Sequence, residues 1–147
     1  MNLVHKIETW GDAHHPGFLD IVRIALGIFL LLKGVAFMEN TTHLKSIIED
    51  QDTIVFSQTI LEALVYIVTF VHMVGGAMIA LGVLTRFSCL IQLPIVLGAV
   101  FITDVFVENI NAQSWLSIVA LALLVLFLII GSGPLSLDNY LAKMHED

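Results

Sequence analysis

The chain contains four apolar runs, each long enough to cross the hydrocarbon core of a membrane. That core is about 30 Å thick and takes about 20 apolar residues of helix. The runs cover residues 18–37, 60–84, 87–106 and 115–130, and they do not alternate as membrane strands do. We therefore predict an all-α fold, a four-helix transmembrane bundle with short interfacial helices, in one domain over residues 1–147.

Composition supports a membrane protein and narrows the range of partners. Of the 147 residues, 58% are hydrophobic and only 13% are charged, whereas about a quarter are charged in soluble domains. The formal net charge of −7 argues against nucleic acid, which binds basic surfaces. Cys89 is the only cysteine, so neither an intramolecular disulfide nor a cysteine-based metal site is expected.

Four spans place both termini on the same side of the membrane. That side holds most of the basic residues: Lys6, Arg23, Arg86 and Lys143. The opposite side holds Lys33 and Lys45. Because basic residues concentrate on the cytoplasmic side, we predict that both termini are cytoplasmic.

Three segments outside the spans have the spacing of short helices. Residues 1–10 suit a helix that lies on the membrane surface. Residues 41–56 form the one sizeable loop on the predicted outer side, and they too have apolar residues at helical spacing. Residues 136–144 begin with Ser136, a helix-capping residue type, and turn apolar side chains toward the interface: Leu137, Tyr140, Leu141 and Met144.

Charged residues within the spans need a partner or a route to the surface, because charge in hydrocarbon is costly. Arg23 lies about five residues inside the first span and either extends to the cytoplasmic surface or pairs with Asp20, one turn earlier. Lys33 and Asp104 come to the same predicted outer depth. They either pair inside the bundle or reach separately for the outer headgroups.

His72 lies near the midpoint of the second span, and its side chain is too short to reach the surface. Small residues share its face of the helix and allow a second backbone to approach closely. These are Gly75, Gly76 and Gly82, and the first span has a matching pair in Gly27 and Gly34. We therefore expect the first two spans to cross in close contact, with His72 directed toward the centre of the bundle.

The expected partners of His72 are Gln92 and the carbonyl of Leu90, which loses its helical partner because Pro94 has no N–H. Three interpretations stay open at this point: a packing contact, a small pocket for a quinone head group or similar ligand, or a metal ligand. A b-type haem is not expected, because the spans contain a single histidine. We predict no intrinsic cofactor and no metal site, with a quinone as the candidate ligand near His72, Arg23, Lys33, Gln92 and Asp104.

Three stretches of the chain resemble the DoxX family of small membrane proteins. They are "VRIALGIFLLLKG" in the first span, "HMVGGAMIALGVLTRFSCLIQLPIVLGAVF" from His72 to Phe101, and "GSGPLSLD" from Gly131 to Asp138. Many members resemble E-x2-GG where this chain has H-x2-GG, so the resemblance implies a polar residue at position 72 but not a carboxylate. Pro134 stands where other members often have a basic residue.

The resemblance implies which complexes and which membrane the protein belongs to, and does not imply a specific activity. Some DoxX-like proteins are associated with quinone-linked sulfur oxidation, as the membrane subunit of a thiosulfate:quinone oxidoreductase, and others with oxidative-stress complexes. The family is mainly bacterial and archaeal, which favours the bacterial cytoplasmic (inner) membrane.

The favoured interpretation is an accessory or anchoring subunit linked to respiratory or redox metabolism. Its expected partners are the lipid bilayer and either an oxidoreductase or further copies of the chain. The alternatives are a structural scaffold without ligand chemistry, and a small-molecule transporter or oligomeric pore in which Lys33 and Asp104 line the path. Whether the chain is itself an enzyme is left open.

Overall fold

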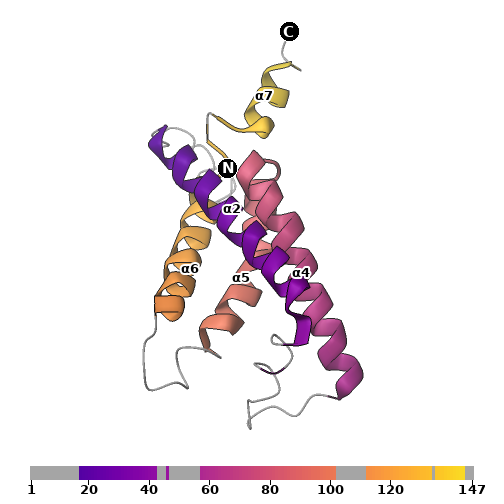
Figure 1. The fold of residues 1–147 in the computed structure, drawn as a ribbon. Helices are drawn as coiled ribbons and strands as arrows, with labels where there is room; N and C mark the ends of the chain where they lie inside the picture. The colour runs from indigo at the N-terminus through magenta and orange to yellow at the C-terminus, as the bar shows by residue number, and fades with distance from the viewer. Residues whose placement is uncertain (1–16, 43–45, 47–56, 102–111, 134, 145–147) are drawn as a thin grey trace, which may run out of the picture.

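The computed structural model describes residues 17–42, 46, 57–101, 112–133 and 135–144, and these residues form an all-α bundle (Figure 1). The four long helices are α2 (Phe18–Glu39), α4 (Gln58–Leu81), α5 (Thr85–Val100) and α6 (Ala112–Ile130). A short helix, α7 (Leu137–Met144), follows. The predicted fold class is thus confirmed. The predicted surface helix at 1–10, most of the 41–56 loop and Asp104 lie outside the described residues.

The helices pack in chain order. α2 lies against α4, α4 against α5 and α5 against α6, while α2 and α6 have a smaller contact than these three pairs. One end of the bundle gathers the start of α2, the end of α4, the start of α5, the end of α6 and all of α7, at the top of Figure 1. We call this end the α7 end. Polar residues that lie far apart in the sequence are therefore brought together there.

The turn between α4 and α5 lies earlier than the sequence suggested. α4 ends at Leu81, and Gly82 takes the left-handed conformation with φ +70°. The Gly82 N–H then donates to the Ile79 carbonyl at 3.2 Å and the Val83 N–H to the Met78 carbonyl at 2.9 Å, which closes the helix end. Thr85 and Arg86, predicted to break the second span from the third, instead begin α5.

Glycines set how closely α2 and α4 approach. A Cβ atom on Gly27 would overlap the backbone of Ala80, and one on Gly76 would lie 2.5 Å from the Leu31 nitrogen. A Cβ atom on Gly34 would lie 2.7 Å from the Met73 nitrogen. Backbone approach of this kind is how helices associate in membranes, where lipid supplies no hydrophobic drive.

The surface of the bundle is apolar along its length, while the interior holds a small core. Core residues from all four long helices include Leu30, Ile79, Val96 and Phe127. α2 and residues 59–81 of α4 are long and apolar enough to cross a membrane, whereas the described parts of α5 and α6 are shorter apolar helices. An open apolar groove of about 200 Å³ separates α2 from α6 and is lined by Val22, Ala25, Leu26, Phe29, Leu116, Val119, Ala120 and Leu123. Large apolar side chains on the outer faces suit contact with lipid acyl chains.

Candidate functional site

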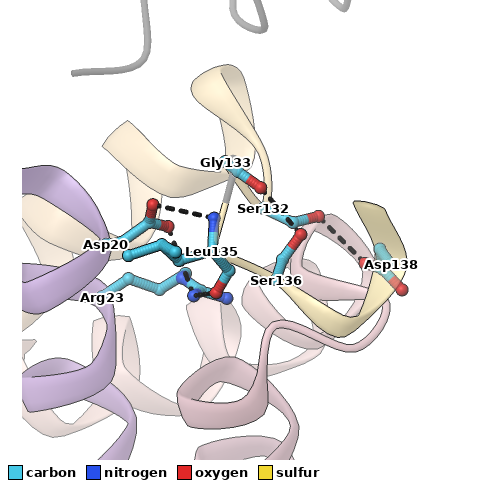
Figure 2. A network of polar contacts seen from close by, with 7 residues as sticks. All are labelled: Asp20, Arg23, Ser132, Gly133, Leu135, Ser136 and Asp138. Atoms are coloured by element: carbon cyan, nitrogen blue, oxygen red, sulfur yellow. Dashed lines mark hydrogen bonds and ion pairs between the residues drawn. The ribbon is translucent and has the colours of Figure 1, made fainter. Parts of the chain in front are cut away.

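A network of polar contacts joins α2 to the segment before α7 (Figure 2). Asp20 and Arg23 are fully buried on consecutive turns of α2, with Arg23 Nη2 3.3 Å from Asp20 Oδ1. Arg23 Nη2 also donates to the Leu135 carbonyl at 2.8 Å. The Leu135 N–H donates to Asp20 Oδ2 at 3.1 Å. The ion pair and one peptide unit thus bond to each other. Of the two alternatives that the sequence left open, Arg23 takes the one in which it pairs with Asp20.

Asp138, in the first turn of α7, ties the helix to two other parts of the chain. Its Oδ1 accepts from the Leu84 N–H at 3.1 Å, and its Oδ2 accepts from the Ser132 hydroxyl at 2.9 Å. Its own N–H donates to the Gly82 carbonyl at 3.2 Å. Figure 2 shows the Ser132 contact beside the bond from the Ser136 hydroxyl to the Gly133 carbonyl. Asp138 therefore holds α7 against the turn that ends α4.

Two glycines and a second arginine complete this end of the bundle. A Cβ atom on Gly82 would overlap Arg23 Nη1, so the guanidinium lies directly over this glycine. Arg86 Nη2 lies 3.4 Å from the carbonyls of both Ile129 and Ile130, at the end of α6. Gly131, with φ +91°, passes Arg86 so closely that a Cβ atom would lie 3.0 Å from Nη2. Arg86 thus binds backbone carbonyls at the end of α6, where carbonyls lack helical partners. Arg23 binds the carbonyl of Leu135, which lies before the start of α7.

His72 is buried, with 5% of its surface exposed, but its partner differs from the one expected. Its Nδ1 lies 3.1 Å from the Val68 carbonyl of its own helix, four residues earlier. Phe37 of α2 meets the imidazole edge to face, with 5.5 Å between ring centroids. Because a carbonyl only accepts, this hydrogen bond requires a proton on Nδ1, and in that neutral tautomer Nε2 is an acceptor. His72 can therefore accept a hydrogen bond from a hydroxyl group.

The other candidates do not gather around His72. Gln92 is fully buried and donates from Nε2 to the Val71 carbonyl at 3.0 Å. It lies over Gly75, where a Cβ atom would come within 2.8 Å of Nε2, so Gly75 serves the α4–α5 contact and not the α2–α4 contact. Lys33 is half-buried, with Nζ 5.7 Å above the Phe29 ring. Its suggested pairing with Asp104 lies outside the described residues.

The expected His72-centred site is therefore spread over two places. Arg23 belongs to the α7 end, while His72 and Gln92 bond to successive parts of the α4 backbone. Sequence reasoning missed Ser132, Leu135 and Asp138 as parts of one network. The motif "GSGPLSLD" contains turn-forming glycines and a carboxylate, which indicate a structured turn. The motif alone does not indicate which residues this turn contacts.

Comparison of the sequence with known protein families gives a match over more than half of the chain. The family model described as DoxX covers residues 18–105, from the start of α2 to beyond α5. The chain belongs to the DoxX family. Neither the curated proteins nor the solved structures that were compared contain a match.

For this DoxX protein, the family match and the network overlap only in part. The matched range includes Asp20, Arg23 and the Gly82 turn, whereas Leu135 and Asp138 lie beyond it. Two parts of the matched range are thus held together by a closing segment outside it. Figure 2 shows Leu135 of this closing segment, residues 132, 133 and 135–138, meeting Asp20 and Arg23 of α2.

Proposed function

We propose that this DoxX protein is a membrane subunit that anchors an oxidoreductase partner at the α7 end of the bundle. The observation that carries the proposal is the way α7 is held. Its first turn is bonded to the turn between α4 and α5, and the residue before Ser136 is bonded to α2. Its other side exposes large side chains: Leu137, Tyr140, Leu141 and Met144. A short amphipathic helix in a fixed position suits recognition by a partner, because little ordering is needed on binding.

The redox part of this proposal rests on the DoxX resemblance. Members of the family are associated with quinone-linked oxidation, and the same resemblance favours the bacterial inner membrane. In such an assembly the partner brings the redox chemistry, and this chain supplies the attachment to the bilayer.

The more specific form of the proposal adds a quinol contact at His72. An unprotonated Nε2 accepts from a hydroxyl, so the arrangement suits the reduced quinol better than the quinone, whose carbonyls are acceptors themselves. Support comes from the Val68 contact, which sets the tautomer. Replacement of His72 by Leu removes the acceptor nitrogen with little change of volume and tests this part separately from anchoring.

The experiment is mass spectrometry of the full chain, purified in mild detergent from its own membrane, with proteins and small molecules both measured. We expect a stoichiometric oxidoreductase subunit and quinol with the wild-type chain. Tyr140→Ala removes a 62% exposed ring from α7 and should reduce the amount of partner several-fold. His72→Leu should keep the partner and lose the quinol.

Tyr66→Ala is the matched control, since this ring is 68% exposed on α4, well away from α7. It should leave partner recovery unchanged. Recovery of the chain without any oxidoreductase would overturn the anchoring proposal and favour the scaffold alternative. An equal loss of partner in both tyrosine variants would show that α7 is not the site of attachment. Retention of quinol by His72→Leu would show that His72 does not bind the quinol.

A further inference from the structure

The inner face of α5 carries polar side chains that the anchoring proposal does not use. Thr85, Ser88 and Gln92 are all buried, and they lie three and four residues apart, which puts them on one side of the helix. The separation of seven positions between Thr85 and Gln92 corresponds to about 10 Å along the helix axis. Among the described residues, no hydrogen-bond partner is found for Thr85 Oγ1, Ser88 Oγ or Gln92 Oε1.

Arg23 extends this series at the α7 end. Its Nη2 is used by Leu135 and Asp20, but Nε and Nη1 have no hydrogen-bond partner within the described part of the chain. The guanidinium lies over Gly82, three residues before Thr85. The N–H donors of Arg23 therefore lie at the α7 end of the series. The side-chain oxygens of Thr85, Ser88 and Gln92 follow toward the middle of the bundle.

Gln92 marks the inner limit of the series. Its Nε2 is bonded to Val71 and lies against Gly75, so its depth is that of the middle of α4. The neighbouring buried side chains Ile79, Cys89 and Val96 are apolar. Neither lipid nor these apolar neighbours offer a hydrogen bond to the polar atoms, and burying them without one costs free energy.

We propose that Arg23, Thr85, Ser88 and Gln92 form a polar track that binds a file of water molecules, running from the α7 end to the middle of the bundle. A buried water typically bonds two to four polar groups and is held where such groups lack protein partners. Arg23 donates to the first waters, and the oxygens of α5 accept from or donate to those that follow. The track gives the membrane interior beside Cys89 access to solvent from one side.

A dry alternative exists for part of the track. A hydroxyl on a helix can turn toward the carbonyl four residues earlier, as Thr69 does with the Val65 carbonyl at 2.8 Å. Gln92 Oε1 and the free N–H groups of Arg23 have no equivalent, because an amide oxygen needs a donor and Arg23 needs further acceptors. Water therefore reaches Cys89 if the track is hydrated, and does not reach it if this part of the bundle is dry.

The test is hydroxyl-radical labelling, in which an X-ray pulse generates radicals from water close to the labelled side chain. The full chain is labelled in lipid nanodiscs, and labelling rates are divided by the intrinsic reactivity of each residue type. Cys89 is 0% exposed and Leu61, near the start of α4, is 1% exposed. We expect the corrected rate at Cys89 to exceed that at Leu61 several-fold, although both are equally buried.

Two variants make the comparison specific. Thr85→Val with Ser88→Ala removes two oxygens from the track and should lower Cys89 labelling several-fold. Thr69→Val removes a buried hydroxyl that already has its partner and should leave Cys89 labelling unchanged. Equal corrected rates at Cys89 and Leu61 in the wild-type chain would overturn the proposal, and this result does not depend on any variant folding. Labelling of Cys89 that is unaffected by the double substitution would also overturn it.

Discussion

Asp20 and Arg23 show how a charged pair is kept inside an apolar bundle. Each makes one contact with the other and one with the Leu135 peptide unit, so the two charges and two backbone groups are matched in a small volume. The net gain from such a pair is small because both ions lose their hydration. Loss of one member is costly, because the remaining charge stays buried without its counterion.

We expect Arg23→Met to destabilise the protein by about 3–5 kcal/mol, the usual cost of leaving one buried ion unpaired. Adding Asp20→Asn to this variant should recover part of the loss, because no charge then remains. The measurement is thermal or denaturant unfolding in detergent. Lys33→Met is the control, and its loss should stay near 1 kcal/mol or below, since its contact is a half-buried cation–π interaction. Losses at Asp20 and Arg23 that simply add would contradict the coupling.

Gly82 is a second residue on which the α7 end depends. Gly82→Ala places a Cβ atom at a left-handed φ of +70° and into Arg23 Nη1. The backbone conformation alone costs about 1–2 kcal/mol, and the displaced guanidinium adds to it. Gly98→Ala is the matched control within α5, because the added Cβ meets no neighbouring atom of the described residues within 4 Å. Unfolding measurements should show the two substitutions changing stability in opposite directions, since alanine favours a helix interior over glycine by about 0.5–1 kcal/mol.

At the scale of elements, the α2–α4 pair depends on contact between backbones. Gly76→Val would place its side chain against the Leu31 nitrogen and the Gly27 carbonyl oxygen, 2.5 and 2.8 Å from the Cβ position. We expect the helices to move apart, with a loss of about 1–3 kcal/mol as in other overpacked contacts. Val74→Leu enlarges an exposed side chain two residues earlier and should be nearly neutral. Equal unfolding midpoints for the two variants would show that the contact is not tight.

At the scale of the whole molecule, the α7 end is the predicted cytoplasmic end. Arg23 and Arg86 both lie there, and Lys33 lies in the second half of α2, toward the opposite end. The charge distribution therefore predicts the orientation by the positive-inside rule. Green fluorescent protein fused after Asp147 should fluoresce, and alkaline phosphatase fused after Gln51 should be active. Phosphatase activity from the fusion after Asp147 would reverse the orientation.

Hydropathy was sufficient to predict the four helices and, for α2 and α4, a length and composition that can cross a membrane. Hydropathy is calculated from residues that are neighbours in the chain. An apolar span near 20 residues long forms a helix in a membrane, because its backbone N–H and C=O groups must bond to each other. The "TR" boundary was wrong because the conformation of Gly82, not the polarity of the next residues, ends α4. The family followed from motifs within the matched range. Helix existence and family were thus determined locally.

Only the tertiary structure decided which polar groups meet. The contacts from α2 to Leu135 span 112 and 115 residues, and that from Leu84 to Asp138 spans 54. His72 was expected to bond to α5 but bonds to its own helix, while Gln92 takes a different carbonyl of α4. A hydrogen bond requires a separation near 3 Å and a defined angle, and these depend on how each helix is rotated and crossed against its neighbours. The sequence alone does not specify how each helix is rotated against its neighbours.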